Sequence, residues 1–233
     1  MSSYDAIAEL YDPWSMSVVE DVAFYLEEAR RSGGPVVELG VGTGRVAVPI
    51  AADGIRVIGI DSSRGMLDVC ARRAALAGVE LDLRVGDLRE PPVSDRVPLV
   101  ICPFRSLLHM HTSEDRRRAL ASVHDLLLPG GRFVFDVFTP AAEDIAKTHD
   151  RWLEREPGIF ERALWDEQER TLTLTVRGEN SETTMALAWL SPDEWRALLE
   201  QSGFEVEACY GWFDRGPYTG GEDTVWITRR GGA

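Results

Sequence analysis

The chain has 233 residues, of which 44% are hydrophobic and 27% charged, as expected for a globular domain with a full hydrophobic core. Its formal net charge of −14 disfavours a nucleic-acid partner, because that kind of binding depends largely on basic groups. The three widely spaced cysteines include no C-x-x-C pair, which argues against a disulfide scaffold or a zinc site, so we expect no bound metal. The N-terminus shows no secretory pattern and no apolar run is long enough to cross a bilayer, so we expect a cytoplasmic protein that binds no membrane.

Residues 1–34 are expected to form an N-terminal helical cap. Apolar residues spaced along one face predict a helix from Ser15 to Arg31. The aromatic segment before this helix, Tyr11-Asp12-Pro13-Trp14, is predicted to be a loop. It is either a hydrophobic cap packed on the core or a flap over a ligand, because loops held by a rigid scaffold often carry function.

A glycine-rich turn follows the first buried strand, which is predicted to end near Leu39. Glycine occupies positions 40, 42 and 44, where it allows a sharp turn and the close approach of a ligand to the backbone. A helix beginning near Thr43 or Gly44 would direct its free N–H groups into this turn, which favours a nucleotide-like ligand. A dinucleotide fingerprint needs glycine or alanine where this chain has Arg45, which disfavours an NAD-dependent oxidoreductase.

Buried strands then alternate with amphipathic helices as far as Phe138. Strands are predicted at Ile55–Ile60, Val79–Val85, Val97–Cys102 and Phe133–Phe138, and helices from Ser62 or Ser63 to Ala77 and from Thr112 to Leu128. The strand at Val79–Val85 alternates apolar and charged residues, so it should lie near a sheet edge. The alternation of strands and helices predicts a doubly wound α/β sheet with mostly parallel strands.

After residue 150 the pattern changes to that of short antiparallel strands. Three strands, Ile159–Trp165, Thr171–Arg177 and Thr183–Leu190, predict a β-meander inserted at residues 151–190. Its tryptophans predict a layer packed on the core, a subunit contact or an aromatic lid over the site. A helix starting at Ser191 and two strands, Phe204–Tyr210 and Thr224–Thr228, follow. With no repeat or long linker, residues 1–233 are expected to form a single domain.

Several of these motifs together resemble the class I S-adenosylmethionine-dependent methyltransferases, in particular their small-molecule branch. The E-x-G-x-G-x-G pattern from Glu38 to Gly44 matches the first motif of that family, and Asp61, Met66 and Gly86-Asp87-Leu88 match later landmarks. The resemblance implies a Rossmann-like sheet of seven strands and S-adenosylmethionine as cofactor, with S-adenosylhomocysteine as product. The set of predicted cofactor-binding residues also includes Tyr11, from the candidate flap, and residues next to these landmarks. The full set is Tyr11, Glu38, Gly40, Val41, Gly42, Gly44, Asp61, Ser62, Met66, Gly86, Asp87, Leu88 and Cys102.

Each landmark also has a structural interpretation. Asp61 can help to cap a helix, Met66 can fill the core and Asp87 can stabilise a turn. Their joint position near strand carboxyl ends, where open α/β sheets bind ligands, favours a cofactor site. The family uses an acid after its second strand to bind both ribose hydroxyls, a role that the resemblance implies for Asp61.

The segment after the fourth strand is where the resemblance places the methyl acceptor. Nucleic-acid amino methyltransferases have Asn or Asp, two prolines and an aromatic residue there; this chain has Cys102 first and Phe104 in place of the second proline, which implies a small-molecule acceptor. The predicted catalytic residues are His109, a candidate base, and Arg105, a candidate partner for a substrate carboxylate or phosphate. A structural histidine and a surface ion pair are the alternatives. The acceptor is also expected to face Asp136 and residues Trp212 to Arg215.

The sequence therefore predicts in-line transfer of a methyl group to an N or O atom of a small molecule. The alternative is a protein that binds the cofactor and acts as a scaffold without methyl transfer, and an oxidoreductase is less favoured. The protein is expected to be a monomer or a homodimer.

Overall fold

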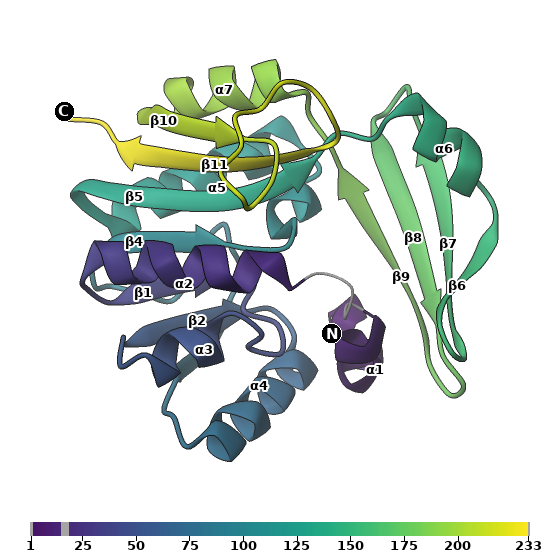
Figure 1. Ribbon diagram of the computed structural model, residues 1–233, viewed down its shortest axis with the longest axis horizontal. Helices are drawn as coiled ribbons and strands as arrows, with labels where there is room; N and C mark the ends of the chain where they lie inside the picture. The colour runs from purple at the N-terminus through teal and green to yellow at the C-terminus, as the bar shows by residue number, and fades with distance from the viewer. Residues whose placement is uncertain (1, 15–18, 233) are drawn as a thin grey trace.

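Seven strands form the larger of two β-sheets in the part of the chain that the computed structural model describes, residues 2–14 and 19–232 (Figure 1). Their order is β10-β11-β5-β4-β1-β2-β3, and only β11 runs antiparallel to its neighbours, β5 and β10. The predicted doubly wound, mostly parallel sheet is thus confirmed, and β3 lies at its edge. The strands are β1 (Val36–Leu39), β2 (Val57–Asp61), β3 (Asp82–Val85), β4 (Val97–Cys102), β5 (Leu127–Phe138), β10 (Phe204–Tyr210) and β11 (Asp223–Arg230).

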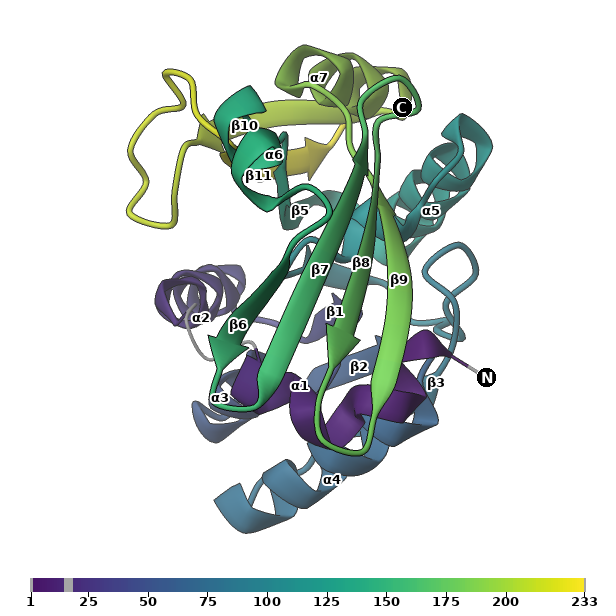
Figure 2. The ribbon, with the colours of Figure 1, turned by 90° about the vertical axis from the view of Figure 1, so that its right-hand side faces the viewer.

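A separate antiparallel sheet, with the strand order β6-β7-β8-β9, lies beyond the carboxyl ends of β4 and β5, whose arrowheads point toward it in Figure 1. Figure 2 shows this sheet in front of the larger one. The sequence predicts three of its strands but misses β6, because β6 is largely polar and lies at an exposed edge. Helix α6, just before it, was not predicted either. The elements of this region are α6 (Ala142–Thr148), β6 (Trp152–Glu156), β7 (Ile159–Asp166), β8 (Thr171–Arg177) and β9 (Glu182–Ala188).

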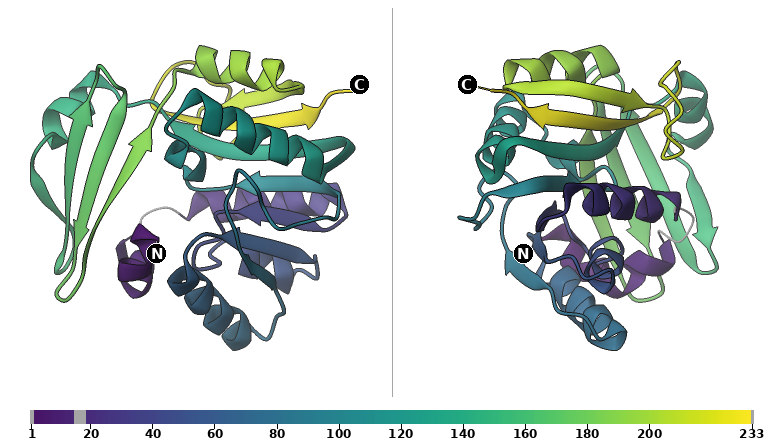
Figure 3. Two further views of the ribbon diagram at one scale, coloured as in Figure 1. Left: turned by 180° about the vertical axis from the view of Figure 1, so that it is seen from behind. Right: turned by 60° about the vertical axis from the view of Figure 1, so that its left-hand side comes forward.

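Helices cover both faces of the larger sheet (Figure 3). On one face lie α2 (Glu20–Ser32), α3 (Ala47–Ala52) and α4 (Arg64–Ala77), and on the other lie α5 (Ser113–Leu126) and α7 (Pro192–Gln201). The side chains of Ser63, Thr112 and Ser191 cap α4, α5 and α7 by accepting a hydrogen bond from the backbone N–H three residues on, so these helices start where the sequence predicts. The buried apolar faces of these helices and of the sheet form the core between them.

The N-terminal segment connects the two sheets. It consists of a 3₁₀ helix, η1 (Ser3–Ile7), and helix α1 (Ala8–Trp14). The carbonyl of Ser3 accepts a 2.6 Å hydrogen bond from the Thr183 hydroxyl on β9, and the Asp5 carboxylate accepts one of the same length from the Ser63 hydroxyl at the start of α4.

The prediction of a loop at residues 11–14 is wrong. These residues belong to helix α1, which contains Pro13. The predicted start of the next helix, at Ser15, lies outside the described residues; α2 is described from Glu20.

Two other boundaries differ from the prediction for backbone reasons. Helix α3 begins at Ala47 rather than near Gly44, because Gly42 and Gly44 adopt left-handed φ angles of 53° and 79°, which end any right-handed helix. Strand β5 begins at Leu127, where the sequence predicts the end of a helix, because Leu127 already pairs with Val97 on β4.

Candidate active site

Two adjoining cavities lie between the carboxyl ends of the parallel strands and the inner face of the four-stranded sheet. The smaller, of about 210 Å³, lies over the turns that follow β1, β2 and β3, and the larger, of about 570 Å³, lies against β7, β8 and β9. Four side chains, those of Tyr4, Tyr11, Phe104 and His109, line both cavities. The cavities therefore meet at these four residues.

The smaller cavity contains most of the predicted cofactor residues. Tyr11, Gly40, Gly42, Asp61, Ser62, Met66, Asp87 and Leu88 all line it. A Cβ atom at position 42 would have no heavy atom nearer than 4.0 Å, so the bare backbone there leaves room for a ligand. Gly40 is required for a different reason, since a Cβ there would lie 2.5 Å from the Ser106 hydroxyl oxygen.

Sequence analysis missed some residues of this wall. Ser2, Ser3, Tyr4, Phe104, Ser106 and Met110 line the smaller cavity without having been assigned to the cofactor. The last three belong to the segment after β4 that the sequence had already singled out, so a signal existed for them. The first three are brought there by the N-terminal segment, and no local pattern indicated this.

Asp61 is held in place by the turns on either side of it. Its Oδ2 accepts a 2.9 Å hydrogen bond from the Gly42 N–H, and its Oδ1 accepts a 2.8 Å bond from the Ser63 N–H. Burial raises the pKa of Asp61, and these two backbone hydrogen bonds oppose that rise. Each carboxylate oxygen retains acceptor capacity, so the residue can also receive the hydroxyls of a ribose.

Asp87 also lines the smaller cavity, but it is engaged by a neighbour. Arg89 donates to both of its carboxylate oxygens, at 2.9 and 2.6 Å. This arginine is the main reason why the pKa of Asp87 lies below its ordinary value. The carboxylate is therefore ionised and oriented at the cavity wall.

Five predicted cofactor residues do not line the smaller cavity: Glu38, Val41, Gly44, Gly86 and Cys102. Gly44 and Gly86 lie against protein instead, since a Cβ would come within 2.5 Å of Cys70 Sγ and 2.4 Å of Pro92 Cδ, respectively. Cys102 is fully buried in the core. Glu38 is only 2% exposed beneath the glycine turn, and its Oε2 has no hydrogen-bond partner among the described residues.

The larger cavity is apolar along the four-stranded sheet and charged elsewhere. Its apolar wall on that sheet consists of Ala163, Trp165, Leu172, Leu174, Met185 and Leu187, and further aromatic rings come from Tyr11, Trp14, Phe104 and Phe138. Its charged side chains are Asp144, Glu156, Glu161, Glu222, Arg105 and Arg155. Acidic groups thus outnumber basic ones.

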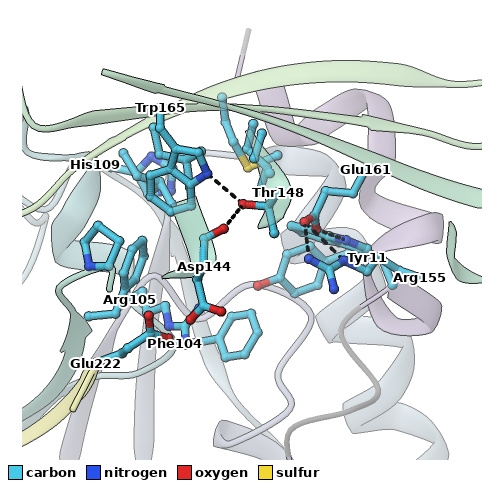
Figure 4. A pocket seen from close by; sticks show the side chains of 18 of the residues that line it. Tyr11, Phe104, Arg105, His109, Asp144, Thr148, Arg155, Glu161, Trp165 and Glu222 are labelled. Carbon is cyan, nitrogen blue, oxygen red and sulfur yellow. Dashed lines mark hydrogen bonds and ion pairs between the residues drawn. The ribbon is translucent and has the colours of Figure 1, made fainter. Parts of the chain in front are cut away.

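Figure 4 shows the charged side chains in two groups. In the first, Arg155 pairs with Glu161 at 2.8 Å, and the second carboxylate oxygen of Glu161 accepts a 3.0 Å hydrogen bond from the Trp14 indole. In the second, Glu222 lies beside Asp144; burial raises the pKa of Glu222, and the neighbouring Asp144 carboxyl raises it further. The first group is thus a paired cation and anion, whereas the second places two carboxyl groups side by side at the wall of the cavity.

His109, the predicted base, lies where the two cavities meet. Its Nε2 is 2.9 Å from the hydroxyl of Tyr4, and the two rings are nearly perpendicular. Burial lowers the pKa of His109 to about 4, with a smaller contribution from nearby His111, so the ring is neutral at neutral pH. A neutral imidazole can accept a proton, and Tyr4 orients this one.

The other residues predicted to face the acceptor differ in their positions. Arg105 does line the larger cavity, where its guanidinium lies 4.7 Å from the centre of the Phe138 ring and pairs with Asp223 at 2.9 Å. The prediction for Asp136 is wrong: its carboxylate is buried and bonded to Tyr25 rather than aimed into the cavity. The loop from Trp212 to Arg215 also lies outside this cavity, because its Phe213 and Arg215 pack on α2.

Within residues 2–14 and 19–232, no three His, Cys, Asp or Glu side chains come together as a metal-binding group. No helix in the same ranges has the length and apolar character needed to cross a membrane.

The fold and the site together define a class: a Rossmann-like α/β protein with a ligand site at the carboxyl ends of its parallel strands. A family model described as "Methyltransferase domain" matches residues 36–131. The structure is similar to that of the CcbJ methyltransferase from Streptomyces caelestis, with a TM-score of 0.87 and 26% identity, covering 100% of this chain and 99% of that one.

Two more proteins extend the comparison. S-adenosylmethionine-bound CalS10, an amino pentose methyltransferase from Micromonospora echinaspora, has a TM-score of 0.69 and 17% identity, over 96% of each chain. The cypemycin N-terminal methyltransferase of a Streptomyces species is 23% identical over 227 residues, which cover 94% of this chain and 90% of that protein. The chain is an S-adenosylmethionine-dependent methyltransferase, as the sequence motifs predicted.

Proposed function

We propose that this enzyme methylates an amine nitrogen of a small molecule with an apolar body. The observation that carries the proposal is that Tyr4, Tyr11, Phe104 and His109 line both the cavity with the cofactor motifs and the apolar, acidic cavity beside it. A methyl group that moves from the cofactor in one cavity to an acceptor in the other therefore moves past these four side chains. The aromatic rings there exclude water from the point of transfer.

In this proposal the smaller cavity holds S-adenosylmethionine. Asp61 receives the ribose hydroxyls, Met66 lies against the adenine, Asp87 binds the adenine edge, and the backbone of Gly40 and Gly42 contacts the methionine part. The cofactor, when bound, supplies a methyl group on a positively charged sulfur atom.

The walls of the larger cavity indicate the chemistry of the acceptor. Its volume of about 570 Å³ suits a molecule of drug size. Its two arginines are already paired with Glu161 and Asp223, whereas Asp144, Glu156 and Glu222 leave a negative wall that attracts a cationic group. The apolar side of the cavity, on the four-stranded sheet, receives the rest of the molecule, so this sheet acts as a lid.

An amine must be neutral to attack a methyl group. His109, held by the Tyr4 hydroxyl, takes the proton that an ammonium group gives up only transiently and passes it on to solvent, because a pKa of about 4 keeps the ring from holding a proton at neutral pH. Arg105 lines the same cavity and orients the acceptor. The name of the cypemycin relative, an N-terminal methyltransferase, supports nitrogen as the attacked atom.

The test is a panel of matched acceptors that share one aryl-alkyl body and differ in the end group: amine, alcohol or carboxylic acid. Transfer of a labelled methyl group from S-adenosylmethionine is measured for each. We expect the amines to be methylated at least roughly 10-fold faster than the matched alcohols. We expect no methylation of the acids, because the negative wall repels an anion. A preference for alcohols would replace nitrogen with oxygen as the target, and a preference for acids would overturn the charge argument.

A further inference from the structure

The backbone is strained where the chain leaves β4 and enters the active site. Phe104 and Arg105 have φ angles of 54° and 64°, in the left-handed region that side chains other than glycine seldom occupy. Within the described residues they are the only two consecutive non-glycine residues with positive φ. Each such residue costs on the order of 1–2 kcal/mol, so surrounding contacts must hold the turn.

Those contacts come from one buried carboxylate. Asp136, on β5, is 6% exposed; its Oδ1 accepts a 2.8 Å hydrogen bond from the Phe104 N–H, and its Oδ2 accepts a 3.1 Å bond from the Arg105 N–H. Strand pairing brings it there, because Cys102 on β4 is in register with the preceding residue, Phe135. Oδ1 also accepts a 2.6 Å bond from the Tyr25 hydroxyl on α2.

The turn sets the position of two side chains of the active site. The Phe104 ring lines both cavities and packs edge-on against Tyr11, with ring centres 6.3 Å apart. The Arg105 side chain lines the larger cavity. Asp136 and Tyr25 line neither cavity, so any influence they have on the reaction passes through this turn.

We propose that Asp136 is a positioning residue for methyl transfer: its carboxyl group fixes the left-handed Phe104–Arg105 turn and so places the Phe104 ring where the two cavities meet. This inference rests on the proposed function, because it assigns the transfer to that place. The two backbone N–H groups need two acceptor oxygens at once. An amide or a hydroxyl at position 136 provides only one acceptor oxygen. The turn then loses one of its two hydrogen bonds even if the protein still folds.

A purely structural role, in which Asp136 only ties α2 to β5 through Tyr25, makes a different prediction, and two variants separate the roles. Asp136→Asn removes one acceptor oxygen from the turn, whereas Tyr25→Phe removes the bond to α2 and leaves both bonds to the turn. Hydrogen–deuterium exchange of the peptide containing residues 103–106 reports the turn directly. We expect the Phe104 and Arg105 amides to exchange at least roughly 10-fold faster in Asp136→Asn and at an unchanged rate in Tyr25→Phe.

Kinetics with the best amine from the panel then test the consequence. In Asp136→Asn we expect kcat to fall at least roughly 10-fold, while the dissociation constant of S-adenosylhomocysteine stays within about 3-fold of the wild type; Tyr25→Phe changes kcat by less than about 3-fold. If Asp136→Asn does not fold, Asp136→Ser, which is smaller and also offers one acceptor, takes its place. Equal losses of kcat in the Asp136 and Tyr25 variants, or no loss in the Asp136 variant, overturn the proposal.

A rescue experiment gives a readout that a structural role would not move. Glycine adopts a left-handed backbone without strain, so Arg105→Gly lessens the need for the carboxylate. In an Arg105→Gly background we expect Asp136→Asn to lower kcat by less than about 3-fold, although Arg105→Gly itself lowers activity. The same loss in both backgrounds contradicts the proposal. If the wild-type enzyme methylates no amine, the proposed function fails, whereas unchanged exchange in Asp136→Asn overturns the role of Asp136 by itself.

Discussion

The hydroxyl of Tyr4 lies 2.9 Å from Nε2 of His109, although 105 positions separate the two residues in the chain. The contact joins the N-terminal segment to the short 3₁₀ helix Ser106–His109, which follows β4, at the place where the two cavities meet. Burial makes His109 neutral at neutral pH and keeps the pKa of Tyr4 well above its ordinary value, so Tyr4 is protonated. The pair is therefore arranged as a neutral donor and acceptor beside the path of transfer.

We expect His109→Ala to lower kcat by about 10- to 100-fold, because the acceptor's proton then leaves without a positioned base. The dissociation constant of S-adenosylhomocysteine, measured by calorimetry, should change little. His111→Ala is the matched control, since His111 is exposed and contacts the Ala186 carbonyl at 2.9 Å without lining either cavity. Equal losses in both variants would show that the effect is not specific to His109.

Stability should depend on pH through His109. Burial lowers its pKa to about 4 in the folded protein, whereas histidine in an unfolded chain titrates near about 6.5. Between these values the unfolded chain binds more protons at this residue, so its contribution is intact above about pH 6.5 and is lost as the pH falls toward 4. We expect the unfolding free energy of the wild type, minus that of His109→Gln, to rise with pH across this window in urea titrations.

The comparison with His109→Gln isolates this residue. Burial raises the pKa of Asp136 to about 6, which acts in the opposite direction, because there the folded protein binds the extra proton. Both proteins contain Asp136, so its effect cancels in the difference. A difference that stays flat with pH would mean that His109 titrates alike in the folded and unfolded states.

Asp61→Ala should weaken binding of S-adenosylhomocysteine by at least roughly 10-fold, because hydrogen bonds to a charged group contribute about 1.5–3 kcal/mol. Asp68→Ala is the control: this acid lies on the same stretch of chain, is exposed and lines neither cavity. Calorimetric titration measures both, with NAD as a ligand expected not to bind. Unchanged affinity in Asp61→Ala would remove Asp61 from the cofactor site.

Two glycines test the packing of the glycine turn. Gly44 and Gly54 both have left-handed φ angles, of 79° and 83°, but a Cβ at position 44 would lie 2.5 Å from Cys70 Sγ, whereas one at position 54 meets nothing within 4 Å. We expect Gly54→Ala to cost about 1 kcal/mol of unfolding free energy from backbone strain alone, and Gly44→Ala to cost about 1–3 kcal/mol more from the clash. Urea unfolding measures both; equal costs would refute the packing role.

The four-stranded sheet should affect the acceptor and not the cofactor. Trp165 lines the larger cavity and packs against Phe138 and Trp189, so we expect Trp165→Ala to raise the KM for an amine by about 10-fold with the affinity for S-adenosylhomocysteine unchanged. The neighbouring Leu164, on the opposite face of β7 and 38% exposed, is the control. An unchanged KM in Trp165→Ala would argue against this sheet as the acceptor lid.

The sequence predicted correctly those features that depend on residues close together in the chain, and it missed features that depend on pairing with distant residues. Strand β4 was predicted with its observed bounds, Val97–Cys102, because a continuous apolar run is a local signal of a buried strand. The starts of α4, at Ser62 or Ser63, and of α7, at Ser191, were predicted because the signals that begin a helix involve residues only a few positions apart. Strand β6 was missed because its residues show no apolar alternation and are ordered by pairing with β7.

The sequence by itself determined the parallel sheet, the glycine turn and the family, because periodicity and short motifs are properties of neighbouring residues. Only the tertiary structure decided that Tyr4 meets His109 and that Asp136 holds the Phe104–Arg105 turn instead of facing the acceptor. Such contacts join residues far apart in the chain. They depend on the register of β4 against β5 and on the way the N-terminal segment packs between the two sheets, which no local pattern encodes.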